Sequence, residues 1–291
     1  MVRRYANSDS GKKCVPVFII GLPRSGSTVL YQLITDIFDV LYFDNLVNIG
    51  RENIYFSMRL SELLFKNRPH QSYSSSFGNT YSDGLHAPSE AGPLWYRWFP
   101  KNVSEVTPEM VSDKKKKDLR LLFSSLMNRS GKPLVVKNLF TVQRMKVLKE
   151  IFPEAKYIYI SRDPFFIAQS IYLGRKMNLV DIDSEWWSVP FPGYESMIGL
   201  PAEKQIANQI FELERIIQNE LRDVDKDNVV ELNYESLDLE IIRKELGSFL
   251  NARFREGFSA EKVNLQIENK IKTDAATVEA IQSELNSIFE S

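Results

Sequence analysis

The amino-acid sequence predicts an α/β protein in which a central parallel sheet is flanked by helices. Short, uniformly apolar runs alternate with segments of helical periodicity, and the first such run ends in a glycine-rich loop. Uniformly apolar runs are typical of strands that are buried on both faces, as in parallel sheets. A strand that leads through such a loop into a helix is typical of phosphate-binding folds, so we expect a P-loop-like arrangement of three layers.

Four strands are expected, and each is followed by a helix whose apolar residues recur every three or four positions. The pairs of strand and helix lie at residues 15–20 and 29–38, 134–136 and 142–151, 157–160 and 166–173, and 229–232 and 239–250. Because parallel strands end at the same edge of a sheet, ligands are expected at their carboxyl ends.

The length of 291 residues allows one large domain, and we expect a single domain over residues 1–291. Residues 1–14 are expected to be a flexible N-terminus, 67–89 a long irregular loop, and 175–205 an aromatic loop or lid. The chain has 37 basic and 38 acidic residues, a net charge of −1, so its overall field does not attract nucleic acid.

Cysteine and histidine are scarce, with one cysteine, Cys14, and two histidines. This composition predicts neither a disulfide nor a metal site, and it favours a reducing compartment. The apolar stretch Cys14–Leu22 is shorter than the roughly 20 residues needed to cross a bilayer. We therefore expect a cytoplasmic protein without a membrane span.

The loop Gly21–Thr28 has the pattern G-x-x-x-x-G followed by two hydroxyl residues. Main-chain N–H groups of such a loop, together with the N-terminus of the next helix, bind a phosphate. ATP-binding loops have a lysine at the position of Ser27, so here Arg24 is expected to supply the positive charge. The residues expected at the nucleotide are Pro23, Arg24, Ser25, Gly26, Ser27 and Thr28.

This loop resembles the 5′-phosphosulfate loop of the sulfotransferase family, which reads Pro-(Lys/Arg)-Ser-Gly-(Thr/Ser)-Thr. The family's second motif binds the 3′-phosphate through an arginine at a strand end and a serine on the next helix. Arg162 and Ser170 match it, eight residues apart. Two such anion sites suit a nucleotide that carries a phosphate group at each end.

Two further segments extend the resemblance, and the first of them, residues 136–153, is similar to the bacterial and tyrosylprotein branch of the family. A lysine follows the second strand there, which corresponds to Lys137, and the segment Asn233–Leu237 is similar to the family's Tyr-Glu-x-Leu sequence. The resemblance implies that Tyr234 lies near the adenine of the donor. It also implies that the donor is 3′-phosphoadenosine 5′-phosphosulfate (PAPS), that the acceptor is a hydroxyl compound, and that no metal takes part.

In-line sulfonate transfer needs cations on the transferring group and a base for the acceptor proton. Arg24 and Lys137 are the expected cations. For the base, bacterial members commonly use a glutamate and cytosolic members a histidine, and the segment 85–99 offers both Glu90 and His86. We favour Glu90, which follows Pro88 in a manner similar to the bacterial arrangement, and we keep His86 as the alternative base or as an acceptor contact.

The acceptor is less defined by the sequence. Loop 67–89 is expected on the acceptor side, and aromatic residues suggest stacking against a saccharide. These residues are Trp95, Tyr96, Trp98, Trp186, Trp187 and Tyr194. Two other functions remain open: a P-loop nucleotide kinase with Asp163 as a magnesium ligand, and a non-catalytic nucleotide-binding protein.

Overall fold

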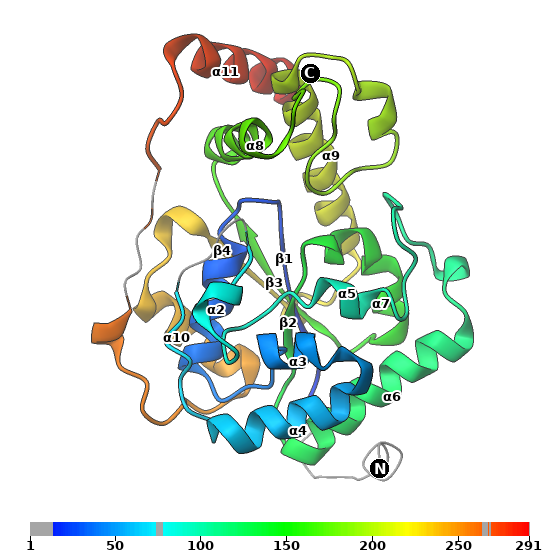
Figure 1. The fold of residues 1–291 in the computed structure, drawn as a ribbon, viewed down its shortest axis with the longest axis vertical. Coiled ribbons are helices and arrows are strands. Elements are labelled where there is room, and N and C mark those ends of the chain that lie inside the picture. The colour runs from blue at the N-terminus through cyan, green and yellow to red at the C-terminus, as the bar shows by residue number, and fades with distance from the viewer. Residues whose placement is uncertain (1–13, 74–77, 264–266, 268, 291) are drawn as a thin grey trace.

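The structure, a computed structural model, describes residues 14–73, 78–263, 267 and 269–290. The expected flexible N-terminus therefore lies outside the described residues, apart from Cys14. Within the described chain, four strands form a parallel sheet in the order β2-β1-β3-β4 (Figure 1). Their bounds are β1 Val17–Gly21, β2 Val135–Lys137, β3 Lys156–Ser161 and β4 Val229–Asn233. The predicted α/β fold with a parallel sheet is confirmed.

The helices occupy the segments between and around the strands. In chain order the α-helices are α2 (Ser27–Ile37), α3 (Asn45–Ile49), α4 (Ile54–Phe65), α5 (Gly92–Trp95), α6 (Asp113–Ser130), α7 (Met145–Ile151), α8 (Pro164–Asn178), α9 (Ala202–Arg222), α10 (Leu239–Leu250) and α11 (Ala275–Phe289). Short 3-10 helices lie at Arg51–Asn53, Tyr81–Asp83, Pro108–Met110, Leu139–Arg144, Tyr194–Met197, Lys226–Asn228, Tyr234–Ser236 and Ala260–Lys262.

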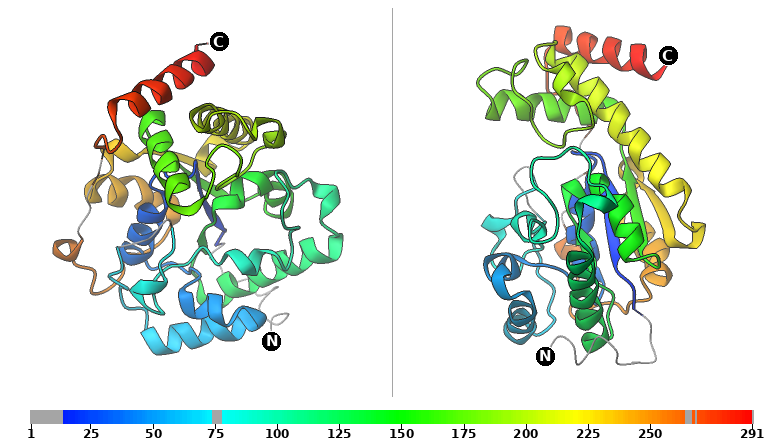
Figure 2. Two further views of the ribbon diagram at one scale, coloured as in Figure 1. Left: turned by 45° about the horizontal axis from the view of Figure 1, so that its top comes forward. Right: turned by 90° about the vertical axis from the view of Figure 1, so that its right-hand side faces the viewer.

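The sheet separates two hydrophobic cores, because successive side chains of a strand point to opposite faces. In β1, Phe18 and Ile20 belong to the core under α6, α7, α8 and α9, whereas Val17 and Ile19 belong to the core under α2 and α10. Burial on both faces explains why the strand is apolar at every position. The long helices α8, α9 and α11 gather at one end of the molecule, beyond the carboxyl end of β1 (Figures 1 and 2).

Two expected elements have different bounds in the structure. The helix expected at 142–151 begins earlier, as a 3-10 helix at Leu139–Arg144, because the side chain of Asn138 accepts a hydrogen bond from the N–H of Phe140 and starts the turn directly after β2.

The aromatic loop expected at 175–205 is shorter than predicted. Its first residues continue α8 to Asn178, and its last residues begin α9 at Ala202. Arg175 of α8 is fully buried and donates to Oε1 of Gln205 in α9 at 2.8 Å. This contact between two helices carries no signal in the local sequence, so the irregular segment is limited to residues 179–201.

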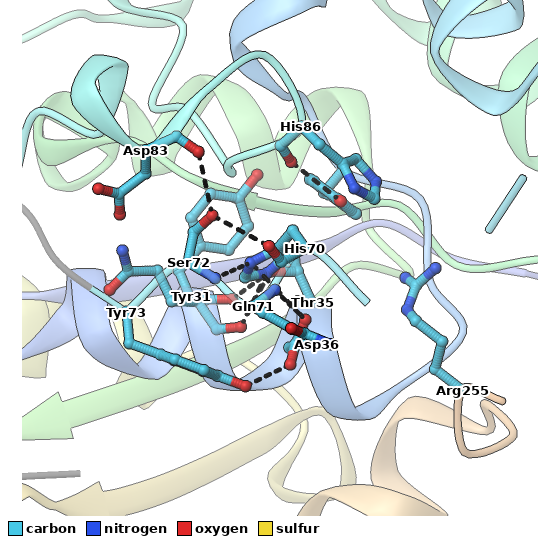
Figure 3. Close-up of polar contacts among 12 residues, drawn as sticks. Tyr31, Thr35, Asp36, His70, Gln71, Ser72, Tyr73, Asp83, His86 and Arg255 are labelled. Atoms are coloured by element: carbon cyan, nitrogen blue, oxygen red, sulfur yellow. Dashed lines mark hydrogen bonds and ion pairs between the residues drawn. The ribbon is translucent and has the colours of Figure 1, made fainter. Parts of the chain in front are cut away.

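The loop expected at 67–89 is anchored to α2 by polar contacts (Figure 3). Nε2 of His70 lies 3.0 Å from Oγ1 of Thr35, and the N–H of Gln71 donates to Oδ1 of Asp36 at 3.0 Å. The part of the loop nearest α4 is therefore fixed against the helix that starts at the glycine-rich loop. No helix in the described residues is both long and apolar enough to span a bilayer.

The register of the sheet brings distant residues together at its carboxyl edge. Gly21, which ends β1, pairs with β3, and Ser161, which ends β3, lies opposite Asn233, which ends β4. The next residues along the chain, Arg162 and Tyr234, therefore leave the sheet side by side and next to the glycine-rich loop.

Candidate active site

The glycine-rich loop reverses direction through two left-handed residues, Arg24 with φ 69° and Gly26 with φ 91°. Gly26 is the N-cap of α2, and no side chain of the described residues caps this helix, so its first N–H groups face the loop. A Cβ atom at Gly26 would lie 2.2 Å from Cδ2 of Tyr234. Glycine is required here both for the backbone conformation and for the ring that packs on it.

The loop borders a cavity of about 460 Å³ at the carboxyl edge of the sheet, and we call it the nucleotide cavity because it is lined by residues that the sequence predicts at a nucleotide. It is lined by Pro23, Arg24, Gly26, Ser27, Thr28, Val29, Gly78, Glu90, Lys137, Leu139, Arg162, Asn178, Trp187, Ser188 and Tyr234. The structure thus brings together in one cavity most of the residues that the sequence predicts for the site.

Two arginines converge on this cavity. Nη1 of Arg162 donates to the carbonyl oxygen of Arg24 at 2.9 Å, and Nε of Arg24 donates to Oγ of Ser170 at 2.8 Å. The Arg162 guanidinium lies over the ring of Tyr234, 4.4 Å from its centroid. Burial, together with the charge of Arg162, lowers the pKa of Arg24 below its ordinary value. Two neighbouring positive charges favour an anion in the space between them.

A lysine and a glutamate form an ion pair in the wall of the same cavity. Nζ of Lys137 donates to Oγ1 of Thr28 at 3.1 Å and forms an ion pair with Oε1 of Glu90. Oε2 of Glu90 accepts from the N–H of Leu139 at 2.9 Å. The surroundings of the Glu90 carboxylate are therefore polar, because Lys137 at the end of β2 and the N–H of Leu139 contact its two oxygens.

The main chain of Glu90 is held by buried side chains. Its carbonyl oxygen accepts from Nδ2 of Asn138 at 3.1 Å and from Nε1 of Trp95 at 3.2 Å. Nη1 of Arg144 donates to Oδ1 of Asn138 at 3.0 Å, and its guanidinium lies 5.7 Å from the ring centroid of Trp95. This network fixes the position of Glu90 relative to Lys137.

Ser25 is placed differently from the other loop residues. Its side chain is fully buried and points toward Gly21, where an added Cβ would lie 2.7 Å from the Ser25 Oγ and 2.7 Å from the carbonyl oxygen of Ile160. Its N–H donates to the carbonyl oxygen of Leu22 at 3.2 Å. The Ser25 side chain thus packs under the loop, next to Gly21, and does not line the cavity.

His86 does not join Glu90 in this cavity. Its ring stacks on Phe65 with centroids 4.2 Å apart, and it lines a separate cavity next to α4. We therefore assign no base function to His86. The aromatic residues also separate: Trp95 and Trp98 are core residues, each 1% exposed, whereas Trp187 lines the nucleotide cavity.

Several residues at the site carry no local signal in the sequence. Asn178, the last residue of α8, and Ser188, within the 179–201 segment, both line the nucleotide cavity. Oδ1 of Asn269 accepts from Nη2 of Arg162 at 2.9 Å, across 107 residues of chain. Only the tertiary fold brings them to the site, although Trp187 stands out in the sequence as part of an aromatic cluster.

A comparison with protein families agrees with this geometry. A model of the Sulfotransferase family matches residues 16–244, a segment that contains the glycine-rich loop, Lys137 and Arg162. The chain belongs to the sulfotransferase family. None of the curated proteins matches it.

Solved structures show that this sulfotransferase shares its fold with other members of the family. The sulfotransferase domain from the curacin biosynthetic pathway has 15% identity and a TM-score of 0.50, over 88% of this chain and 82% of that one. The sulfotransferase STF9 from Mycobacterium avium has 14% identity and a TM-score of 0.50, over 99% of this chain and 79% of that one.

Proposed function

We propose that this sulfotransferase moves the sulfonate group of PAPS to a hydroxyl acceptor, without a metal ion. One observation carries the proposal: the nucleotide cavity holds two arginines, an uncapped helix N-terminus and a lysine–glutamate pair. The arginines and the helix N-terminus suit an anionic donor, and the glutamate suits the removal of a proton from an acceptor.

The two ends of the donor are assigned to different groups. The N–H groups of the loop and of α2 bind the 5′-phosphosulfate, and Arg24 adds its charge. Arg162 and Ser170 bind the 3′-phosphate. Tyr234 lies on the adenine side. The hydrogen bond from Arg24 to Ser170 supports this assignment, since it links the two anion sites at 2.8 Å.

The transfer step exchanges one oxygen on sulfur for another. The acceptor oxygen forms a bond to sulfur while the bond from sulfur to the 5′-phosphate oxygen breaks, and adenosine 3′,5′-bisphosphate leaves. Glu90 takes the proton of the acceptor hydroxyl. Lys137, whose Nζ lies 3.1 Å from Thr28 Oγ1 at the start of α2, stabilises the charge that develops on the bridging oxygen.

In this mechanism the ion pair between Lys137 and Glu90 must open before Glu90 can act as the base. In this pair Oε1 of Glu90 contacts the Lys137 ammonium, and Oε2 accepts from the N–H of Leu139, so both oxygens have protein partners. A bound sulfonate competes for Lys137, and Glu90 is then released toward the acceptor. The base is thereby activated in the presence of the donor.

For the acceptor we propose a saccharide or another small hydroxyl metabolite. Trp187 supports a sugar, since this aromatic residue lines the cavity together with Gly78 of the loop 67–89, which we assign to the acceptor side. Cytoplasmic location remains part of the proposal and is supported by the single cysteine in the chain.

The test combines binding and transfer. Calorimetry should show that adenosine 3′,5′-bisphosphate binds in the presence of a chelator, and sulfur-labelled PAPS should transfer its label to one of three extracts: polysaccharides, lipids or peptides. Binding without any transfer would favour a non-catalytic nucleotide-binding protein. Absence of nucleotide binding, or metal-dependent hydrolysis of ATP, would contradict the proposal.

A further inference from the structure

A second cavity of about 280 Å³ lies near the amino end of β2, at the opposite edge of the sheet from the nucleotide cavity. We call it the basal cavity. Its walls include Tyr42, Phe65, His86, Arg129, Lys132 and Arg255. It shares no lining residue with the nucleotide cavity.

A buried arginine without an acidic partner forms one side of the basal cavity. Arg255 is 4% exposed, and within the described residues no carboxylate forms an ion pair with it. Nη2 donates to the carbonyl oxygen of Phe38 at 3.0 Å, and Nη1 donates to Oδ1 of Asn67 at 2.6 Å. These neutral acceptors orient the guanidinium but do not neutralise its charge, and buried charges are normally paired.

Two hydrogen-bond donors in this wall have no acceptor. Nε of Arg255 and Nε of Arg129 are both buried, and neither has a partner among the described residues. The Arg129 guanidinium forms an ion pair through Nη2 with Glu62, the acidic residue of the cavity wall. Lys132, also in the wall, pairs with Asp39, but Lys66 and Arg255 have no ion-pair partner among the described residues, so positive charge remains in excess. The wall therefore offers uncompensated positive charge to an anion.

The remaining wall is aromatic and apolar. His86 stacks on Phe65 and lies 5.9 Å from the ring centroid of Tyr42. Burial, together with His70 and the charge of Arg255, lowers the pKa of His86 to about 3. Its ring is therefore uncharged at neutral pH. Figure 3 shows the rings of His70 and His86 in one cluster, with the Arg255 guanidinium on the side toward His86.

We propose that the basal cavity binds a small organic anion. Its single carboxylate, sulfonate or phosphate group lies against the positively charged part of the wall, formed by Arg129, Arg255 and Lys66, and its apolar body lies against Phe65, His86 and Tyr42. An organic anion suits the wall better than an inorganic ion, because an inorganic ion would leave the aromatic side chains of the wall without an apolar partner.

The probe is 2-naphthoate, measured by calorimetry on the full chain with a saturating amount of adenosine 3′,5′-bisphosphate present. Binding is expected to persist under this condition, and the uncharged isostere 2-naphthamide should bind at least tenfold more weakly. Arg255→Gln should weaken naphthoate binding at least tenfold, and Lys66→Glu, an exposed position at the rim, about threefold or more. Lys114→Glu makes the same charge change on the exposed start of α6 and should have no effect.

Several outcomes would overturn the proposal. Equal affinity for naphthoate and naphthamide would show that the cavity is only apolar, and equal affinity of Lys66→Glu and Lys114→Glu would place the anion elsewhere. Displacement of naphthoate by the nucleotide would assign the binding to the nucleotide cavity. If circular dichroism shows that Arg255→Gln does not fold, Lys66→Glu and Phe65→Ser decide, and both must weaken binding for the proposal to stand.

Discussion

The nucleotide cavity and the basal cavity use arginine in the same way but are assembled differently. In each, a guanidinium donates to a main-chain carbonyl: Arg162 to Arg24 in the nucleotide cavity, and Arg255 to Phe38 in the basal cavity. A carbonyl oxygen holds the side chain in place and leaves its net charge for a ligand. For recognising an anion site, the neutral hydrogen-bond partners of an arginine are therefore as informative as its ionic partners.

The difference lies in what supplies the remaining donors. The nucleotide cavity depends on backbone shape, since Gly26 and the start of α2 present N–H groups directly. The basal cavity depends on side chains that come from five separate segments of the chain. Substitutions in the nucleotide cavity should therefore change ligand affinity through backbone geometry as well as charge. Substitutions in the basal cavity should change ligand affinity through charge and burial.

The largest effect is expected for Glu90→Gln, which keeps an acceptor for the Leu139 N–H but removes the base. Turnover should fall by about 10² to 10⁴, and the affinities for the nucleotide and for naphthoate should stay within about twofold of wild type. Steady-state rates and calorimetry measure both quantities. Glu105→Gln, which changes a surface glutamate paired with Lys146, is the control and should leave turnover unchanged.

If Glu90→Gln retains more than about a tenth of wild-type turnover, Glu90 is not the base. A parallel loss of nucleotide binding would show that it has a structural role in holding Lys137.

Gly26→Ala tests the dependence of the nucleotide cavity on backbone shape. The new Cβ would meet the ring of Tyr234 at 2.2 Å, so nucleotide affinity should fall at least about tenfold, beyond the cost of a left-handed alanine of roughly 1 kcal/mol. Gly193 has nearly the same backbone, with φ 88° and ψ 5°, and nothing lies within 4 Å of an added Cβ. Gly193→Ala should leave the nucleotide affinity unchanged, and equal affinities of the two variants would refute the close packing of Tyr234.

Arg162→Ala should remove a charge-assisted contact of about 1.5 to 3 kcal/mol to the 3′-phosphate, which corresponds to a ten- to hundredfold weaker binding of adenosine 3′,5′-bisphosphate. Calorimetry measures this change. Arg215→Ala, on the exposed surface of α9, is the control. Wild-type affinity in Arg162→Ala would remove the assignment of the 3′-phosphate, and a change in naphthoate binding would show that the two cavities are coupled.

The smallest expected effect is a change in the free energy of unfolding with pH. It depends on the buried histidines in and beside the basal cavity. Burial lowers the pKa of His70 to about 4, against the opposing charge of Asp36. As the pH falls below about 6.5, the unfolded chain takes up a proton before the folded one, so stability decreases down to about pH 4. The lowered pKa of His86 contributes to the same loss of stability. Burial raises the pKa of Asp44 to about 6, which has the opposite sign and offsets part of the loss below pH 6.

Urea unfolding at pH 7 and pH 5 should therefore show a net loss of about 2 kcal/mol, since each pKa unit corresponds to about 1.4 kcal/mol. His70→Gln should reduce this dependence. A stability that is equal at both pH values, or higher at pH 5, would contradict the assignment of neutral buried histidines to this region.

Much of the fold and of the nucleotide cavity follows from the sequence, because the relevant signals are local. A buried strand needs an apolar run, and a loop that binds phosphate through N–H groups needs glycines at a set spacing before a helix. Arg162 and Tyr234 could also be found, since each directly follows a strand of a parallel sheet. The contacts between them depend on the sheet order, which the sequence alone did not determine.

Other features were decided only by the tertiary structure. The separation of His86 from Glu90, four residues further on, depends on how the main chain passes Phe43 and crosses from one cavity to the other. Asn269 reaches Arg162, and Arg255 reaches Phe38, across more than a hundred residues of chain. Such contacts leave no periodic pattern or fixed spacing in the sequence, because they form between elements that pack together only in the folded chain. The sequence alone therefore determines the sheet and the phosphate loop, whereas the pairing of Glu90 with Lys137 and the existence of the basal cavity depend on the packing of the whole chain.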